Sequence, residues 1–193
     1  MRTELRAIAT KVLNCKFTDE IVIPDEINEK ILHIAQLLAI LRSTIKRDNF
    51  TKDIMYKPFS EMATRLSKQF KKLLKGVCMF RHIKVADDKA YQVIKRCVLG
   101  TIPSRLGDIV RIMYTKNPRA SYNLDEITAM VRLPNMTTQR NLDGLTILEV
   151  LDRRVAGVKP EWKLSAQALE LIETTELYRR PNANAKVKAA RIR

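Results

Sequence analysis

Apolar residues recur at helical spacing along most of residues 1–100. The stripe is clearest over residues 26–41, where isoleucine and leucine return every three or four positions, and it appears again over residues 60–77 and 87–100. A shorter stripe covers residues 3–14. Because this spacing places apolar side chains on one face of a helix, we predict a bundle of about four helices.

A set of shorter elements begins after Pro103. Three helices are predicted here, over residues 104–115, 124–131 and 136–148. Asn123 and Glu126 form a capping pair that defines the start of the second helix, and the segment before it, 117–123, is expected to be a loop.

A β-hairpin is predicted next. Two short segments, 150–157 and 159–165, lie around Gly157 and Pro160 and carry the composition of strands that flank a turn. A last helix is expected over residues 166–178. The order of helix, helix, turn, helix and hairpin is that of a winged helix-turn-helix domain.

The expected fold is therefore mainly α, with three parts. A helical bundle occupies residues 1–100, and a winged helix-turn-helix domain with a small β-hairpin wing occupies residues 101–178. A basic tail, 179–193, has no apolar period and is expected to be disordered.

Charge is strongly positive and unevenly distributed. The 193 residues carry a formal net charge of +15, which favours a polyanionic partner, most often nucleic acid. Residues 42–96 hold 15 basic and 5 acidic side chains, residues 101–178 hold 10 of each, and residues 179–193 hold 6 basic and no acidic ones. The excess lies in the middle of the chain and in the tail, while the predicted winged helix is neutral.

Several functional classes are disfavoured by what the sequence lacks. It contains no GxxxxGK[ST] phosphate loop, no GxSxG and no HExxH, so we expect no enzyme activity from this chain alone and no cofactor. Cys15, Cys78 and Cys97 lie far apart, and His33 and His82 are isolated, so no metal site is expected.

Targeting signals are also lacking. No run of 18 apolar residues is present, and the N-terminus has no apolar signal-peptide core. We therefore expect a cytoplasmic protein with no membrane partner.

The stretch LPNMTTQRNLDGL, residues 133–145, is the candidate for reading DNA bases. Its helix places polar residues away from the leucine side; they are Thr137, Gln139, Arg140 and Asn141. The third helix of a winged helix presents its N-terminal residues to the major groove, where Gln and Asn can bond adenine and Arg can bond guanine. Asp143 lies one turn beyond Arg140 and could pair with it. The alternative is that this face meets solvent or another protein.

Two further groups of cations are candidates for phosphate contact. The hairpin carries Arg153, Arg154 and Lys159, at positions where wings usually meet the DNA backbone; Trp162 nearby is expected in the core. The helix over residues 60–77 has a basic outer face, which consists of Arg65, Lys68, Lys71, Lys72 and Lys75.

Several segments together resemble the C-terminal region of MCM-like AAA+ ATPases of bacteria, phages and mobile elements. The resemblance covers roughly residues 17–172, and its segments are IVIPDEINEKILHIAQLLAILRSTIKRD, PFSEMATRLSKQFKKLLKGVCMFRHIKVADDKAYQVIKRCVLGTIPSR, LPNMTTQRNL and EWKLS. It implies an AAA+ lid followed by a winged helix. It also implies that Arg65, in MATRLSKQF, is a sensor arginine that touches the γ-phosphate of ATP, often from a neighbouring subunit; the alternative is a surface arginine on a basic helix. The phosphate loop, Walker B acid and arginine finger of the family are missing here.

These observations favour a DNA-binding protein that forms the lid and winged-helix portion of a replication ATPase. Its expected partners are DNA and an ATPase domain or neighbouring subunit. Two alternatives stay open: a winged-helix transcriptional regulator with a helical dimerisation domain, and a protein–protein docking module of a replication complex.

Overall fold

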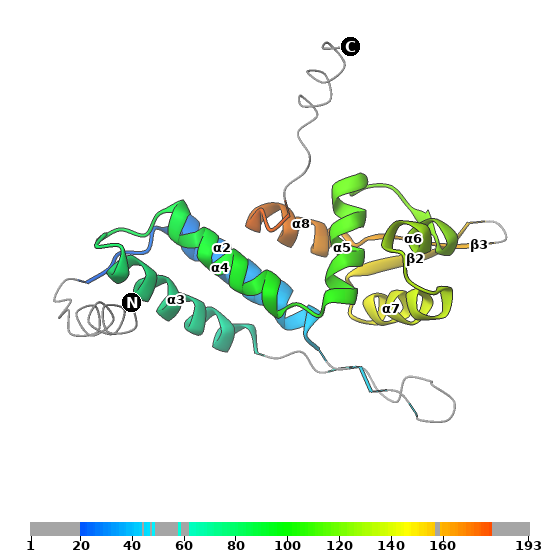
Figure 1. The fold of residues 1–193 in the computed structure, drawn as a ribbon, viewed down its shortest axis with the longest axis horizontal. Coiled ribbons are helices and arrows are strands. Elements are labelled where there is room, and N and C mark those ends of the chain that lie inside the picture. Colours follow the sequence, from blue (N-terminus) through cyan, green and yellow to red (C-terminus); the bar gives the residue numbers. More distant parts are fainter. Residues whose placement is uncertain are drawn as a thin grey trace, which may run out of the picture.

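Seven helices and three short strands make up the described part of the chain. The structure is a computed structural model, and it describes residues 20–43, 45, 46, 48, 58, 62–156 and 159–178. The helix expected over residues 3–14, the tail 179–193 and Gly157 at the hairpin tip lie outside the described residues. Long helices occupy one half of the molecule, and short helices and strands occupy the other (Figure 1).

Three long helices pack together in the first half, as the apolar stripes predict. They are α2 (Asp25–Leu41), α3 (Ala63–Phe80) and α4 (Asp88–Thr101). Helix α2 lies at the centre of the group and contacts both of the others. Its Ile31, Ile34 and Leu38 are fully buried, or nearly so, as are Leu74 of α3 and Ile94 of α4.

The connection between α3 and α4 is held by Asp87. Its Oδ1 accepts a hydrogen bond from the Ala90 N–H at 2.8 Å, which caps α4, and both of its oxygens pair with Arg81, with Nη2 to Oδ2 at 2.9 Å. The hydrogen bonds from Arg81 and from the Ala90 backbone stabilise the charged carboxylate and lower the pKa of Asp87 to about 2. The same connection forms a short parallel bridge between Val22 and Val85.

Shorter elements form the second half. They are α5 (Ser104–Lys116), β1 (Tyr122–Asn123), α6 (Leu124–Val131), α7 (Asn135–Ile147), β2 (Leu151–Ala156) and β3 (Lys159–Leu164). The predicted capping pair is confirmed: Asn123 Oδ1 accepts from the Glu126 N–H at 3.0 Å, and Glu126 Oε2 accepts from the Asn123 N–H at 2.9 Å. The predicted hairpin is also confirmed, as β2 and β3 pair in antiparallel register.

Strand β1 was not predicted, because the segment before α6 reads as a loop. Tyr122 pairs with Trp162 and Asn123 with Glu161, so the sheet is antiparallel with the order β1-β3-β2. Two residues are too few to show the alternation that marks a strand in sequence. The pairing brings Tyr122, which is 6% exposed, beside the fully buried Trp162.

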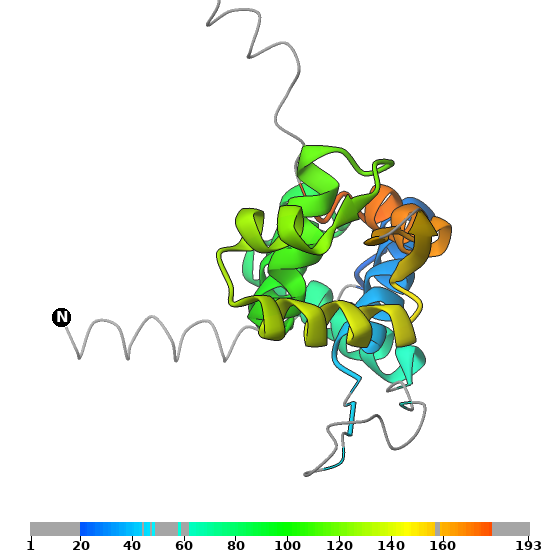
Figure 2. The same ribbon diagram turned by 90° about the vertical axis from the view of Figure 1, so that its right-hand side faces the viewer.

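The last helix, α8 (Ala166–Thr175), belongs by sequence to the domain expected over residues 101–178. In the structure it lies against α2 of the first half (Figure 2). The Tyr91 hydroxyl donates to the Thr175 carbonyl at 3.0 Å, and Lys30 pairs with Glu176 at 3.4 Å. Leu171 and Ile172 are buried in the same hydrophobic core as the residues of both halves. Helix α8 therefore ties the two halves together.

Candidate nucleic-acid interface

Helix α7 is held against the second half by its leucine side, as predicted. Leu142 and Leu145 are fully buried together with Thr138, and the helix contacts α6, β2 and α5. The turn that leads into it places Arg132 in the left-handed region, with φ 57° and ψ 40°, and Pro134 directly precedes the helix. With respect to the described residues, the opposite side of α7 is exposed at Met136 and Arg140.

The four candidate base-reading residues of α7 are not equivalent. Arg140 is exposed, whereas Thr137, Gln139 and Asn141 are partly buried. Asp143 pairs with Gln139 through a hydrogen bond of 2.8 Å from Nε2 to Oδ1. Reading a base with Gln139 would require breaking this bond, whereas Arg140 is the most exposed of the four.

Asn141 lies on the flank of α7 that faces the start of α5. Its side-chain nitrogen is shielded from solvent and has no hydrogen-bond partner among the described residues. It lines a pocket together with Arg105 and Arg140. Asn141 is therefore placed beside the outward face of the helix rather than on it.

The two arginines of β2 point to opposite faces of the hairpin. Arg153 is paired across the strands with Trp162, and its guanidinium lies 5.6 Å from the centre of the indole ring. Arg154 is paired with Glu161 on the other face, because successive side chains of a strand alternate in direction. Both are exposed. Because they lie on opposite faces of the hairpin, a flat surface of a partner could contact only one of them. Trp162 is fully buried, which confirms its predicted place in the core.

The third hairpin cation, Lys159, is paired within the chain. Its ammonium lies 2.8 Å from Oδ2 of Asp125, in the first turn of α6. The hydrogen bond and the charge of Asp125 raise the pKa of Lys159 above its ordinary value. Both side chains are largely exposed, so the pair is weak, yet a phosphate would have to compete with Asp125 for this lysine.

Helix α3 presents the strongest cationic surface of the described residues. It contains no Asp or Glu, and Arg65, Lys68, Lys72 and Lys75 recur at steps of three and four residues on its exposed side. Lys71 is half-buried beside the segment Ile21 to Ile23. We call the four exposed residues the α3 basic face.

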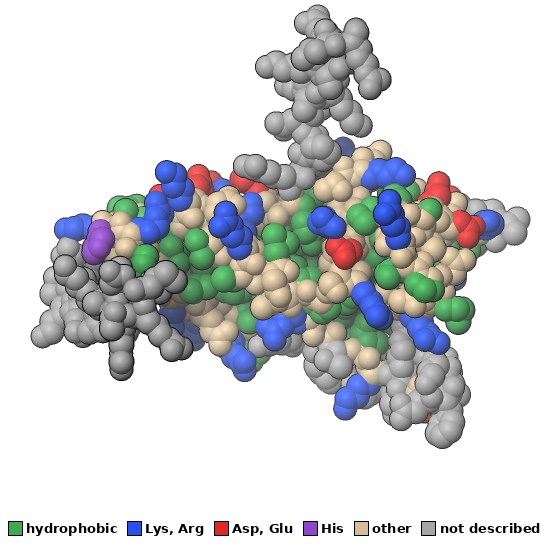
Figure 3. Space-filling view, viewed as in Figure 1, with side chains coloured by type: hydrophobic (Ala, Val, Ile, Leu, Met, Phe, Trp, Pro, Cys, Tyr) green, Lys and Arg blue, Asp and Glu red, His purple; other side chains and the backbone are tan. Residues whose placement is uncertain are grey.

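Helices α3 and α7 lie along one edge of the molecule. In Figure 1 both helices run along the lower edge, and in Figure 2 both again lie in the lower part of the view. Figure 3 shows Lys and Arg side chains along that lower edge. Two helices from distant parts of the chain, each with exposed cations, therefore share an edge.

Two exposed residues near α7 were missed by the sequence analysis. Arg105 follows Ser104 at the start of α5, and Met136 is 66% exposed in the first turn of α7. A signal for each was present in the sequence. Arg105 comes directly after the Pro-Ser that begins a helix, and Met136 is an apolar residue outside the leucine stripe. Val155, near the hairpin tip, is another apolar residue that is 78% exposed.

Neither a metal cluster nor a membrane span is found within the ranges that the structure describes. No three His, Cys, Asp or Glu side chains among these residues are grouped closely enough to hold an ion. Likewise, none of the helices α2 to α8 is long and apolar enough to cross a bilayer.

Comparisons with family models, with curated proteins and with solved structures find no match to this chain.

Proposed function

We propose that this protein binds duplex DNA along the edge formed by the α3 basic face and α7. The observation that carries the proposal is the acid-free helix α3 with its four exposed cations, because this helix lies along the same edge as α7, whose Arg140 is exposed. Phosphates repeat closely along duplex DNA, so a row of cations gains affinity without any dependence on base sequence.

The order of elements supports a winged-helix interpretation of the second half. Strand β1 lies between α5 and α6, α7 follows α6 directly, and the β2–β3 hairpin comes next; β3 lies at the centre of the small sheet. In such a domain α7 would take the position that enters the major groove, with the hairpin beside it as the wing. In this proposal Arg140 reaches the groove and Arg154 meets the backbone.

The resemblance to MCM-like AAA+ ATPases supports a role for this activity in DNA replication. In this part of the proposal, residues 1–100 act as the lid of an ATPase assembly, and Arg65 contacts nucleotide held by a neighbouring domain. The position of Arg65 supports that role, since its side chain is exposed in the first turn of α3.

Salt dependence of binding tests the proposal. Affinity for a duplex of random sequence is measured by fluorescence anisotropy between 50 and 200 mM salt. Contacts with four to six phosphates predict a slope of log affinity against log salt of roughly −4 to −5. Absence of binding at 50 mM salt, or a slope near zero, would contradict DNA binding.

A docking module is the second candidate, favoured by two exposed apolar side chains. Met136 and Val155 lie on α7 and β2, in a half whose sequence is neutral overall. A protein partner would bury such residues, and aromatic residues and Met are enriched at interfaces. In that case, changing both to Ser would abolish capture of a replication protein while leaving the salt slope for DNA unchanged.

A further inference from the structure

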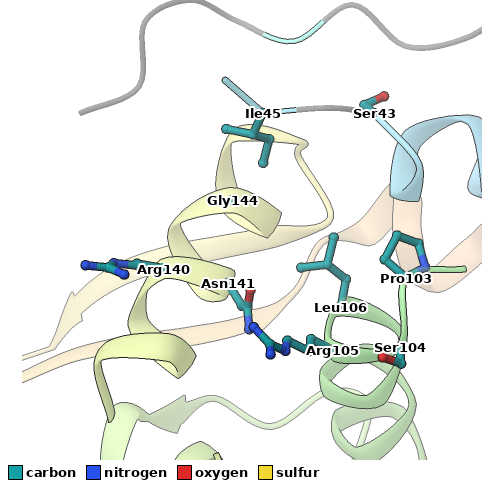
Figure 4. A pocket seen from close by; sticks show the side chains of 9 residues that line it. All are labelled: Ser43, Ile45, Pro103, Ser104, Arg105, Leu106, Arg140, Asn141 and Gly144. Atoms are coloured by element: carbon teal, nitrogen blue, oxygen red, sulfur yellow. The ribbon is translucent and has the colours of Figure 1, made fainter. Parts of the chain in front are cut away.

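A pocket of about 480 Å³ lies on the flank of α7, between that helix, the start of α5 and the chain that leaves α2 (Figure 4). The Ile45 side chain lies against α7 at Gly144, where a Cβ would come within 2.8 Å of Ile45 Cδ1 unless that flexible side chain shifted. Ile45 and Leu106 supply apolar walls; Ser104, Arg105 and Asn141 lie at the lower end in this view (Figure 4), and Ser43 lies at the upper end beside Ile45.

Hydrogen-bond donors converge in this pocket without an acid to balance them. None of the described side chains that line it is Asp or Glu. Arg105 and Asn141 point toward each other across it, whereas the guanidinium of Arg140 points away on the other side of α7 (Figure 4). The Asn141 amide nitrogen is shielded from solvent and has no partner among the described residues. An acceptor that enters the pocket between them would satisfy the shielded Asn141 donor and meet the exposed Arg105 guanidinium.

The N-terminus of α5 also favours the binding of an anion in this pocket. Pro103 precedes the helix and its side chain makes no capping hydrogen bond. The first backbone N–H groups of a helix have no partner within it, and they carry a partial positive charge. Ser104 and Arg105, which line the pocket, belong to this first turn.

We infer that the pocket binds a phosphate group of the DNA backbone, with the Arg105 guanidinium and the Asn141 amide as donors. This inference rests on the proposed function, because it places a backbone phosphate beside α7 while Arg140 reaches outward from the other side of the same helix. The site would fix the position of α7 on the duplex, as phosphate contacts do in general. It also gives Asn141 a role different from base reading.

Three variants of the full chain test the assignment. Arg105→Ala removes the guanidinium, and Asn141→Asp replaces the amide by a carboxylate of the same shape that repels phosphate. Arg119→Ala, on an exposed cation in the loop before β1, is the matched control. Loss of one charge-assisted contact predicts about a tenfold loss of duplex affinity for Arg105→Ala and a salt slope shallower by about 0.9. We expect Asn141→Asp to lose at least as much duplex affinity as Arg105→Ala. The control, Arg119→Ala, should change the affinity and the salt slope by less.

An NMR titration provides a second measurement that does not depend on folding of the variants. The side-chain signals of Asn141 and Arg105 are followed while a random-sequence duplex, or inorganic phosphate in a separate sample, is added to the wild-type chain. The inference predicts that the duplex shifts both signals. A different result would overturn the pocket assignment and leave the proposed function standing: DNA binds with the predicted salt slope, the side-chain signals do not shift, and the variants bind DNA as the wild type does.

Two other outcomes also have a definite meaning. If inorganic phosphate shifts the signals and DNA does not, the site takes a free phosphate and the assignment to the DNA backbone is overturned. If the wild-type chain binds no DNA at all, the proposed function and this inference fail together.

Discussion

The carboxylate of Asp87 serves two elements at once. It caps α4 through the Ala90 N–H and pairs with Arg81 just beyond the end of α3. Both contacts favour the ionised form, which is why the pKa of Asp87 falls from an ordinary 3.8 to about 2. A group whose pKa is lowered on folding stabilises the fold above its unfolded-state pKa, and this stabilisation is lost as the pH falls through the folded value.

Replacing Asp87 by Ala should therefore destabilise the protein in a pH-dependent manner. At pH 7 the free energy of unfolding, measured by urea denaturation, is expected to fall by about 1–2 kcal/mol, the usual effect of removing a helix N-cap. The difference from wild type should shrink as the pH is lowered from 5 to 2. Asp88→Ala, at the neighbouring exposed carboxylate, should have a smaller effect; equal effects for the two variants would refute a special role for Asp87.

At the scale of elements, local chemistry predicted the starts and ends of most of them. The Asn123 and Glu126 capping pair correctly predicted the start of α6, and the leucine stripe correctly predicted the buried side of α7. Strand β1 was missed because its pairing with β3 involves residues about forty positions apart. Arg153 and Arg154 lie on opposite faces of the hairpin, an alternation that the sequence of a strand already predicts; their role as phosphate contacts stays a prediction.

The turn between α6 and α7 allows a prediction about stability. Arg132 has φ 57°, a left-handed conformation that is unfavourable for a side chain with a Cβ and favourable for Gly. Arg132→Gly is expected to raise the free energy of unfolding by about 0.5–1 kcal/mol. The control is Arg96→Gly, at an exposed position inside α4, where Gly should lower it by about 1 kcal/mol. A loss of stability in both variants would show that the turn is not strained.

At the scale of the whole molecule, the last helix packs on the first half, and two helices with exposed cations share one edge. Helix α8 packs on α2 and joins the halves, and α3 lies along the same edge as α7. The sequence predicted each basic segment separately. It could not predict that they share an edge, because that depends on how α2, α5 and α8 pack across long separations in the chain.

Charge reversal on the α3 basic face tests the central claim most directly. One variant carries Lys68→Glu, Lys72→Glu and Lys75→Glu; the control carries Lys89→Glu, Arg96→Glu and Arg119→Glu, exposed cations outside α3 and α7 that change the net charge by the same amount. Affinity for a random duplex is compared at several salt concentrations, after circular dichroism has shown that both variants fold. We expect the first variant to lose most of its duplex binding and its salt slope to become shallower by roughly 2–3, the contribution of three phosphate contacts. Equal losses in the two variants, or no loss in the first, would contradict it.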